Sequence, residues 1–196
     1  MRLRNKWYDM NRDKLIKVID DTIKNIWENE IAYDYADGWL LKEDTLKNSF
    51  YFHLRTKLGK IFDENDIRLF TEFTDDKFRG SGCIPDMVIA KVDFDKDERY
   101  YGDYIEECLC VIEFKYKTGF NSADLIYKDY EKMCKYVKEL DVNCKLYMAT
   151  IWEYEDKPKN WTRKNAAWAK NLLTELNASY ELGTTDMRFY VFEHKE

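Results

Sequence analysis

A glutamate and a lysine two positions apart lie near the end of the most strand-like segment of the 196-residue chain. Residues 108–116 read CLCVIEFKY and carry Glu113 and Lys115. Because side chains alternate along an extended strand, these two side chains point to the same face. Burying such charges is costly unless they pair with one another or bind an ion. The alternative is a simple ion pair at a strand end, so a catalytic interpretation needs further acidic residues nearby.

One such residue opens the preceding apolar segment. Pro85 and Asp86 lie at the start of the predicted strand 84–92, where the missing N–H of proline is tolerated. If the two strands are neighbours, Asp86 lies beside Glu113. Two carboxylates and a main-chain carbonyl of the Glu113 strand form a hard oxygen site suited to Mg²⁺. The alternative for Pro85 and Asp86 is a turn that only begins a strand.

This arrangement predicts hydrolysis of a phosphodiester bond. The metal would stabilise charge on the phosphate, and Lys115 would either orient the attacking water or help to deprotonate it. A further carboxylate, Glu43, lies three residues before Leu46 and seven before Phe50, on the apolar stripe of a predicted helix. It either caps the start of that helix or reaches a polar site inside, and Asp44 competes for the role.

Apolar periodicity predicts an α/β fold, because helical segments alternate with strands. Helices are expected at about 14–27, 40–58, 122–140 and 161–177, and strands at 67–73, 84–92, 108–116, 145–154 and 187–192. The order predicts a mixed central sheet flanked by helices, a three-layer α/β/α sandwich. The length fits a single domain, 1–196, with an N-terminal helical extension at 1–36 and an insertion at 93–107.

The composition is that of a folded chain with an acidic surface. Hydrophobic residues make up 45% of the chain, which is enough to build a core. The formal net charge of -6 counts mildly against a nucleic-acid enzyme, because phosphate neutralisation usually needs a basic surface. A carboxylate-rich metal site is itself acidic, so local patches matter more than the total.

Cysteine and histidine usage argues against other site chemistries. The five cysteines form no CxxC pair, and only two histidines are present, which disfavours zinc and favours reduced cysteines in a cytoplasmic protein. No apolar run approaches the ~20 residues of a membrane span, and we expect no membrane partner. The sequence also lacks a GxGxxG motif, a P-loop and a GxSxG motif.

The combined pattern resembles the PD-(D/E)xK, or restriction-endonuclease-like, nuclease superfamily. The resemblance rests on GCIPDMVIAK followed by CLCVIEFKYKTG. The segment LKEDTLKNSFYFHLR looks like the first core helix of that family, in which Glu43 fits the acidic position. The segment DLIYKDYEKMCKY resembles the helix after the motif. The resemblance spans about 40–136, and it implies a restriction-endonuclease-like fold.

The resemblance also implies roles for individual residues. It implies catalytic roles for Asp86, Glu113 and Lys115, and metal ligation of Mg²⁺, or of Mn²⁺ in its place, by Glu43, Asp86 and Glu113. Residues of the following helix that could assist are Lys128, Asp129 and Lys132. Basic residues that could contact nucleic acid are Arg55, Lys57, Lys60 and Lys117; the alternative is that these are solvated charges.

The implied function is that of a metal-dependent endonuclease or exonuclease, with DNA in preference to RNA as its substrate. The alternative is a catalytically inactive protein of the same fold that binds protein or nucleic acid. The acidic total and the tyrosines of the insertion, Tyr100, Tyr101 and Tyr104, favour a protein partner, including a second copy of the chain.

Overall fold

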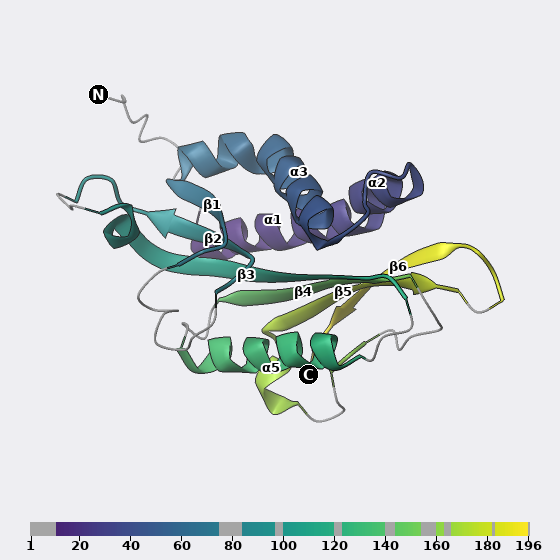
Figure 1. Cartoon of the computed structure of the whole chain (residues 1–196). Coiled ribbons are helices and arrows are strands. Elements are labelled where there is room, and N and C mark those ends of the chain that lie inside the picture. The colour runs from purple at the N-terminus through teal and green to yellow at the C-terminus, as the bar shows by residue number, and fades with distance from the viewer. Residues whose placement is uncertain are drawn as a thin grey trace.

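We describe the fold from a computed structural model of the chain (Figure 1). The structure describes residues 11–74, 84–96, 100–119, 123–139, 144–153, 160–162, 166–181 and 183–195. Its helices are α1 (Arg12–Asn25), the π-helical η1 (Ile26–Ile31), α2 (Ala32–Ala36), α3 (Glu43–Glu64), α5 (Asp124–Glu139) and the 3₁₀ turns η2 (Tyr101–Tyr104) and η3 (Ala167–Ala169). Its strands are β1 (Ile67–Thr71), β2 (Met87–Val92), β3 (Ile105–Lys117), β4 (Lys145–Trp152), β5 (Leu173–Tyr180) and β6 (Met187–Glu193).

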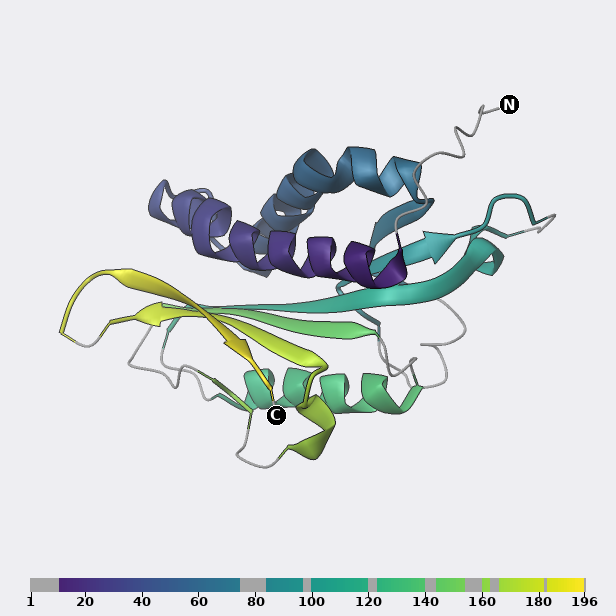
Figure 2. The same cartoon turned by 180° about the vertical axis from the view of Figure 1, so that it is seen from behind.

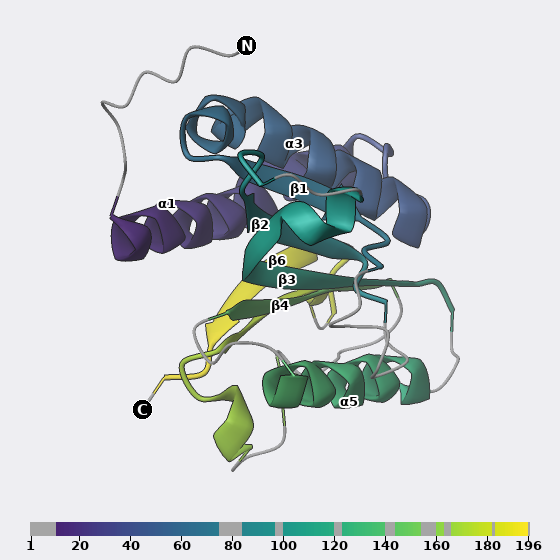
Figure 3. The ribbon, with the colours of Figure 1, turned by 90° about the vertical axis from the view of Figure 1, so that its left-hand side faces the viewer.

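The described strands form one mixed sheet in the order β1-β2-β3-β4-β5-β6. β1, β2 and β3 pair antiparallel, β3, β4 and β5 pair parallel, and β6 returns antiparallel to β5. Helices α1 and α3 cover one face of the sheet and α5 covers the other, which the opposite and side views show clearly (Figures 2 and 3). The predicted α/β class with a mixed sheet is confirmed, and the arrangement is compatible with a three-layer sandwich. Among the described helices, none combines the length and the apolar character needed to cross a membrane.

Two apolar clusters, one on each face, explain why the side chains of β3 point as they do. Ile112 and Phe114 belong to the cluster under α1 and α3, and the Phe114 ring meets the Phe50 ring edge-on at 5.3 Å between centroids. Val111 belongs to the cluster under α5, together with Met133. Because side chains alternate, Glu113 follows Val111 to the α5 face.

The sequence predicted most of these elements at the right places, with one clear error. The predicted helix at 161–177 is wrong. Within the described part of that segment, Ala167–Ala169 is a short 3₁₀ turn and Leu173–Tyr180 is strand β5. β5 pairs with β4 on one edge and with β6 on the other, and its two faces contribute to the two apolar clusters, so its residues are buried without a clean alternation. Strand pairing thus overrides a local pattern that suits a helix.

The ends of the motif strands also differ slightly from expectation. β2 begins at Met87 rather than at residue 84, so Asp86 lies just before the strand. β3 begins at Ile105, and its first three residues therefore belong to the segment 93–107 that was expected to be an insertion. The described part of that segment connects β2 to β3 as a hairpin, with irregular register at two points. The hairpin brings the two motif strands side by side.

A buried carboxylate on β5 ties the following segments to the sheet. Glu175 is fully buried and accepts hydrogen bonds from the backbone N–H groups of Trp161 and Thr162, from Asn177 Nδ2 (3.0 Å) and from His194 Nε2 (2.9 Å). Burial alone raises the pKa of Glu175, but these donors outweigh it and hold the pKa below its ordinary value. The ionised carboxylate is therefore a structural anchor for residues near 161 and for the C-terminal strand end.

We expect Glu175→Ala to lower the free energy of unfolding by about 3 kcal/mol or more, because it leaves buried donors without their acceptor. Urea denaturation measures the change, with Glu181→Ala on the exposed β5–β6 connection as the matched control. The folded-state pKa of Glu175 lies below 4.5, so its contribution is present above that pH and is lost as the pH falls through the lower value. A Glu175→Ala variant as stable as the control at pH 7 would contradict this role.

Candidate functional site

Asp86 is held at the junction of the two motif strands. Its carboxylate Oδ2 accepts a hydrogen bond from the backbone N–H of Phe114 at 2.8 Å, and its own carbonyl accepts one from Glu72 N at 3.0 Å. The predicted neighbourhood of the two strands is confirmed, since β2 and β3 pair with Met87 opposite Ile112. Asp86 therefore lies beside the residue that follows Glu113.

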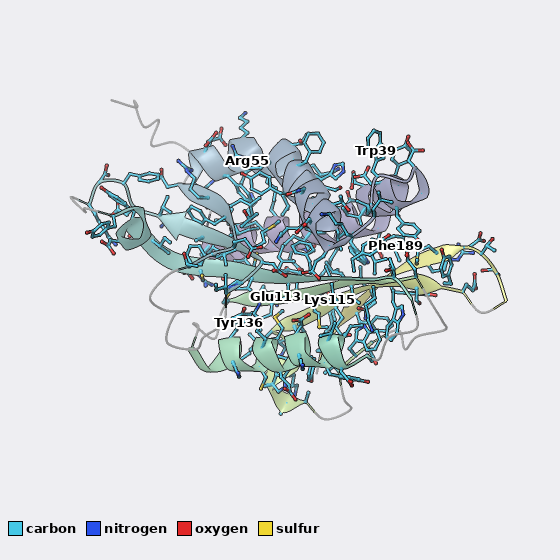
Figure 4. All side chains as sticks on the ribbon, viewed as in Figure 1. Trp39, Arg55, Glu113, Lys115, Tyr136 and Phe189 are labelled. Atoms are coloured by element: carbon cyan, nitrogen blue, oxygen red, sulfur yellow. The ribbon has the colours of Figure 1, made fainter. Side chains whose placement is uncertain are left out.

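Glu113 lies between β3 and α5 and is only 2% exposed. Tyr136 donates its hydroxyl proton to Oε1, and Lys132 donates from Nζ to Oε2, both at 2.7 Å. Lys132 Nζ also donates to the carbonyl oxygen of Ile84 at 2.7 Å, so this one cation joins Glu113 to the chain just before Asp86. Figure 4 shows Glu113 on the sheet with Tyr136 facing it from α5.

Burial raises the pKa of Glu113 to about 8, and the nearby charge of Asp86 adds to the rise. Lys132 and Tyr136 act in the opposite direction, because they donate to the ionised form. Two adjacent carboxylates, one of them buried and hard to ionise, make a place where an added positive charge is favourable. Carboxyl groups with such perturbed pKa values are typical of functional sites, although structural networks produce them too.

Lys115 joins the two helical layers near the C-terminal end of β3. Its Nζ lies 3.0 Å from Glu43 Oε2 on α3 and 3.0 Å from Asp129 Oδ2 on α5. Burial lowers the pKa of Lys115, but Asp129 and Glu43 outweigh this effect and raise it to about 12. Burial also raises the pKa of Asp129, which the charge of Lys115 partly offsets. Lys115 is thus a firmly protonated cation between two carboxylates.

The first turn of α3 places Glu43 within reach of Lys115. The hydroxyl of Thr45 accepts from the backbone N–H groups of Leu41 (2.9 Å) and Lys42 (3.0 Å), which fixes the chain as it enters the helix. From the other side of β3, the Tyr116 hydroxyl donates to the Leu40 carbonyl at 2.9 Å. Of the two alternatives for Glu43, the structure shows the reach toward a polar site, while Thr45 caps the helix.

Two residues near the site carried no functional prediction from the sequence. Tyr136 was not assigned a polar role, although it follows Lys132 by four residues and therefore shares its helix face. Lys47 on α3 forms an ion pair with Glu72; burial lowers its pKa, but Glu72 and the charge of Asp86 raise it overall. The i, i+4 spacing from Glu43 to Lys47 would have indicated that both belong to the same face.

Most of the predicted nucleic-acid contacts lie elsewhere. Arg55 is exposed on the outer side of α3, as Figure 4 shows. Lys57 pairs with Glu30 at 2.6 Å, and Lys60 lies 3.8 Å from Glu64. Lys117 is buried, with its Nζ 4.5 Å from the centre of the Trp152 ring. Of the three predicted accessory residues on α5, Asp129 contacts Lys115 and Lys132 contacts Glu113. Lys128 is exposed.

The donor set fits a hard divalent cation in part. Asp86 and Glu113 supply carboxylate oxygens from adjacent strands, the ligand type that Mg²⁺ prefers. Both oxygens of Glu113 accept hydrogen bonds, so a cation bound there would compete with Lys132. Glu43 pairs with Lys115 rather than lying with the other two acids. Across the described residues, no cluster of three or more His, Cys, Asp or Glu side chains is arranged to hold a metal ion.

Comparison with known proteins adds no relative. No family model matches the chain, and neither a curated protein nor a solved structure matches it.

Titration of Glu113 tests the electrostatics of the site. Carbon-13 NMR of the side-chain carboxyl groups should show Glu113 ionising near pH 8 in the metal-free protein. Asp86→Asn should lower that pKa by removing a like charge, and Lys132→Met should raise it by removing a donor. The pKa of Glu113 in the folded protein lies above its ordinary value of 4.5. Its contribution to the free energy of unfolding is therefore fully present below pH 4.5 and is lost as the pH rises toward 8. A midpoint near 4.5 in the wild-type protein would contradict the buried environment.

Proposed function

We propose that the chain is a metal-dependent nuclease of the PD-(D/E)xK type that hydrolyses phosphodiester bonds in DNA. The observation that carries the proposal is the position of Asp86 against the backbone of Phe114, between Glu113 and Lys115. Asp86, just before β2, thereby lies beside the part of β3 that carries Glu113 and Lys115. Asp129 and Lys132, from the helix after the motif, contact Lys115 and Glu113.

The order of the elements around these residues supports the same proposal. An acid-bearing helix, α3, precedes three antiparallel strands that carry the motif, and α5 and the parallel strand β4 follow. This is the order in which the resemblance places the acidic first core helix, the motif strands and the following helix. A restriction-endonuclease-like sandwich is therefore the fold that we propose. Fold alone does not fix function, so the proposal rests on the site.

Each motif residue has a distinct role in the proposed reaction. Bound Mg²⁺ would supply a Lewis acid for the phosphoryl oxygens and lower the pKa of water. Asp86 and Glu113 would hold it, and Glu113 would have to ionise to do so. Lys115, with a pKa of about 12, is poorly suited to accept a proton near neutral pH. We therefore assign Lys115 to orienting the water and stabilising negative charge, with Glu43 and Asp129 holding its ammonium group in place.

A second candidate function is binding without turnover. The hydrogen bonds that occupy both oxygens of Glu113 favour it, because they complete the environment of that carboxylate within the protein. An inactive protein of this fold would keep Glu113 as a neutral or hydrogen-bonded group rather than as a metal ligand. The experiments below separate the two functions, since only the nuclease requires the charge of Asp86 and a divalent cation.

Asp86→Asn should abolish cleavage, with a loss of roughly 100-fold or more, while the protein stays folded. The asparagine oxygen can still accept from Phe114 N, so the variant removes the charge and keeps the hydrogen bond. The measurement is cleavage of labelled single-stranded, double-stranded and branched DNA during titration with Mg²⁺ or Mn²⁺. Asp44→Asn, an exposed acid on the first turn of α3, is the matched control. Cleavage retained by Asp86→Asn would rule out the assigned site.

Lys115→Ala should reduce cleavage by a similar factor with little change in substrate affinity, because the lysine acts on the water and on developing charge. Lys128→Ala, which removes an exposed lysine of α5, should cleave as the wild type does. Single-turnover rates and equilibrium DNA binding, measured side by side, separate the two effects. Equal rates for Lys115→Ala and Lys128→Ala would contradict the role of Lys115.

A further inference from the structure

An open hollow with a volume of about 430 Å³ lies between α2 and the outer side of α3. Its lining includes Asp34, Trp39, Asn48, Ser49, Phe52 and His53. The hollow is built on the face of α3 opposite the stripe that packs into the core. It shares no residue with the predicted nuclease site. The size falls within the usual range for a binding site, about 300–1,000 Å³.

Two aromatic side chains at this hollow are displayed to solvent. Trp39 is 69% exposed and Phe52 is 63% exposed. The backbone of Trp39 is nevertheless fixed: α2 ends with Gly38 at a φ of 77°, Gly38 N donates to Tyr35 O, and Trp39 N donates to Asp34 O at 2.9 Å. This pair of hydrogen bonds is a Schellman motif. An exposed tryptophan on a well-defined turn can bind with little loss of backbone freedom, and Figure 4 shows it at the surface beside α2.

The carboxylate of Asp34 forms the polar part of the hollow. Its Oδ2 accepts hydrogen bonds from the Ser49 hydroxyl and from His53 Nε2, the latter at 2.9 Å. Ser49 and His53 are four residues apart and so share one face of α3. Both donate to the carboxylate, so neither activates the other as a nucleophile. The arrangement holds Asp34 in position next to the two aromatic rings.

The surrounding charge selects the sign of the ligand. Residues 25–41 contain four acidic residues and neither lysine nor arginine. Lys42, which directly follows this segment, pairs with Asp44 at 3.1 Å, and Lys57 of α3 pairs with Glu30 at 2.6 Å. A phosphate group would be repelled here, whereas a cation would be attracted by Asp34 and by the faces of Trp39 and Phe52. The hollow is therefore unsuited to the strand of a nucleic acid.

We propose that this hollow binds an arginine side chain from a basic segment of a partner protein. A guanidinium group is planar and stacks on aromatic rings, and it can also donate to a carboxylate. Two further exposed residues provide apolar contact for neighbouring parts of the segment: Tyr33, 64% exposed, directly precedes Asp34, and Leu41, 72% exposed, lies two residues after Trp39. The partner would dock on the opposite side of α3 from the predicted nuclease site.

The test is calorimetric titration of the full chain with a short peptide that contains two arginines separated by glycine. The control peptide carries citrulline at both positions, which keeps the shape and removes the charge. We expect the arginine peptide to bind and the citrulline peptide to bind at least about tenfold more weakly. Trp39→Ala should weaken binding of the arginine peptide about fivefold or more. Tyr127→Ala, which removes a 38% exposed aromatic of α5, should leave binding unchanged.

Nitrogen-15 NMR of the indole N–H groups locates the binding. The Trp39 resonance, identified from its loss in Trp39→Ala, should shift on addition of the arginine peptide and not on addition of a single-stranded oligonucleotide. Several results would overturn the proposal: equal binding of both peptides, no binding of either, an unchanged affinity in folded Trp39→Ala, or a Trp39 shift with the oligonucleotide alone. The last result would assign the hollow to nucleic acid instead.

Discussion

The burial of one carboxylate, that of Glu113, constrains the arrangement of the rest of the predicted site. β3 is covered on both faces, so its alternating side chains send Glu113 into the layer between the sheet and α5. A carboxylate in that position needs donors, and α5 provides Lys132 and Tyr136 one turn apart. The position of α5 against the sheet and the position of the motif are thus linked by the same contacts. Moving either would leave a buried charge unpaired, which is costly.

A second link connects the two helical layers through Lys115. Glu43 comes from α3 on one face of the sheet, and Asp129 comes from α5 on the other. They can reach the same ammonium group because β2 begins opposite Ile112, so no β2 residue pairs with β3 at Lys115 and the sheet is open on that edge. The segment before α3 is held by two hydrogen bonds: the Tyr116 hydroxyl of β3 donates to the Leu40 carbonyl, and the backbone N–H of Leu41 donates to the Thr45 hydroxyl of α3. The C-terminal part of β3 is therefore the point at which the sheet, α3 and α5 position one another.

The sequence predicted the motif strands and their neighbourhood well because both signals are local. Pro85 and Asp86 mark the start of an apolar strand, and the alternation of β3 fixes which residues share a face. The helix predicted at 161–177 was wrong because the burial of β5 depends on β4 and β6, which are distant in the sequence. Tyr136 was missed for a similar reason. A tyrosine on an apolar helix stripe looks like core until the strand packed against it is known to carry a carboxylate.

A comparison of the two carboxylates buried on this face distinguishes support of the fold from a role in chemistry. Glu113 and Glu175 lie in one row across the sheet, since both are in register with Met148 of β4. Glu175 receives two backbone N–H groups and three kinds of side-chain donor, and its pKa is lowered. Glu113 receives two donors, lies beside Asp86, and has a pKa raised to about 8. The environment of Glu175 stabilises the fold, because its donors fully compensate the charge of the carboxylate. In the environment of Glu113, the donors do not fully offset burial and the charge of Asp86. The ionised form of Glu113 is therefore disfavoured in the protein alone and favoured once a cation binds.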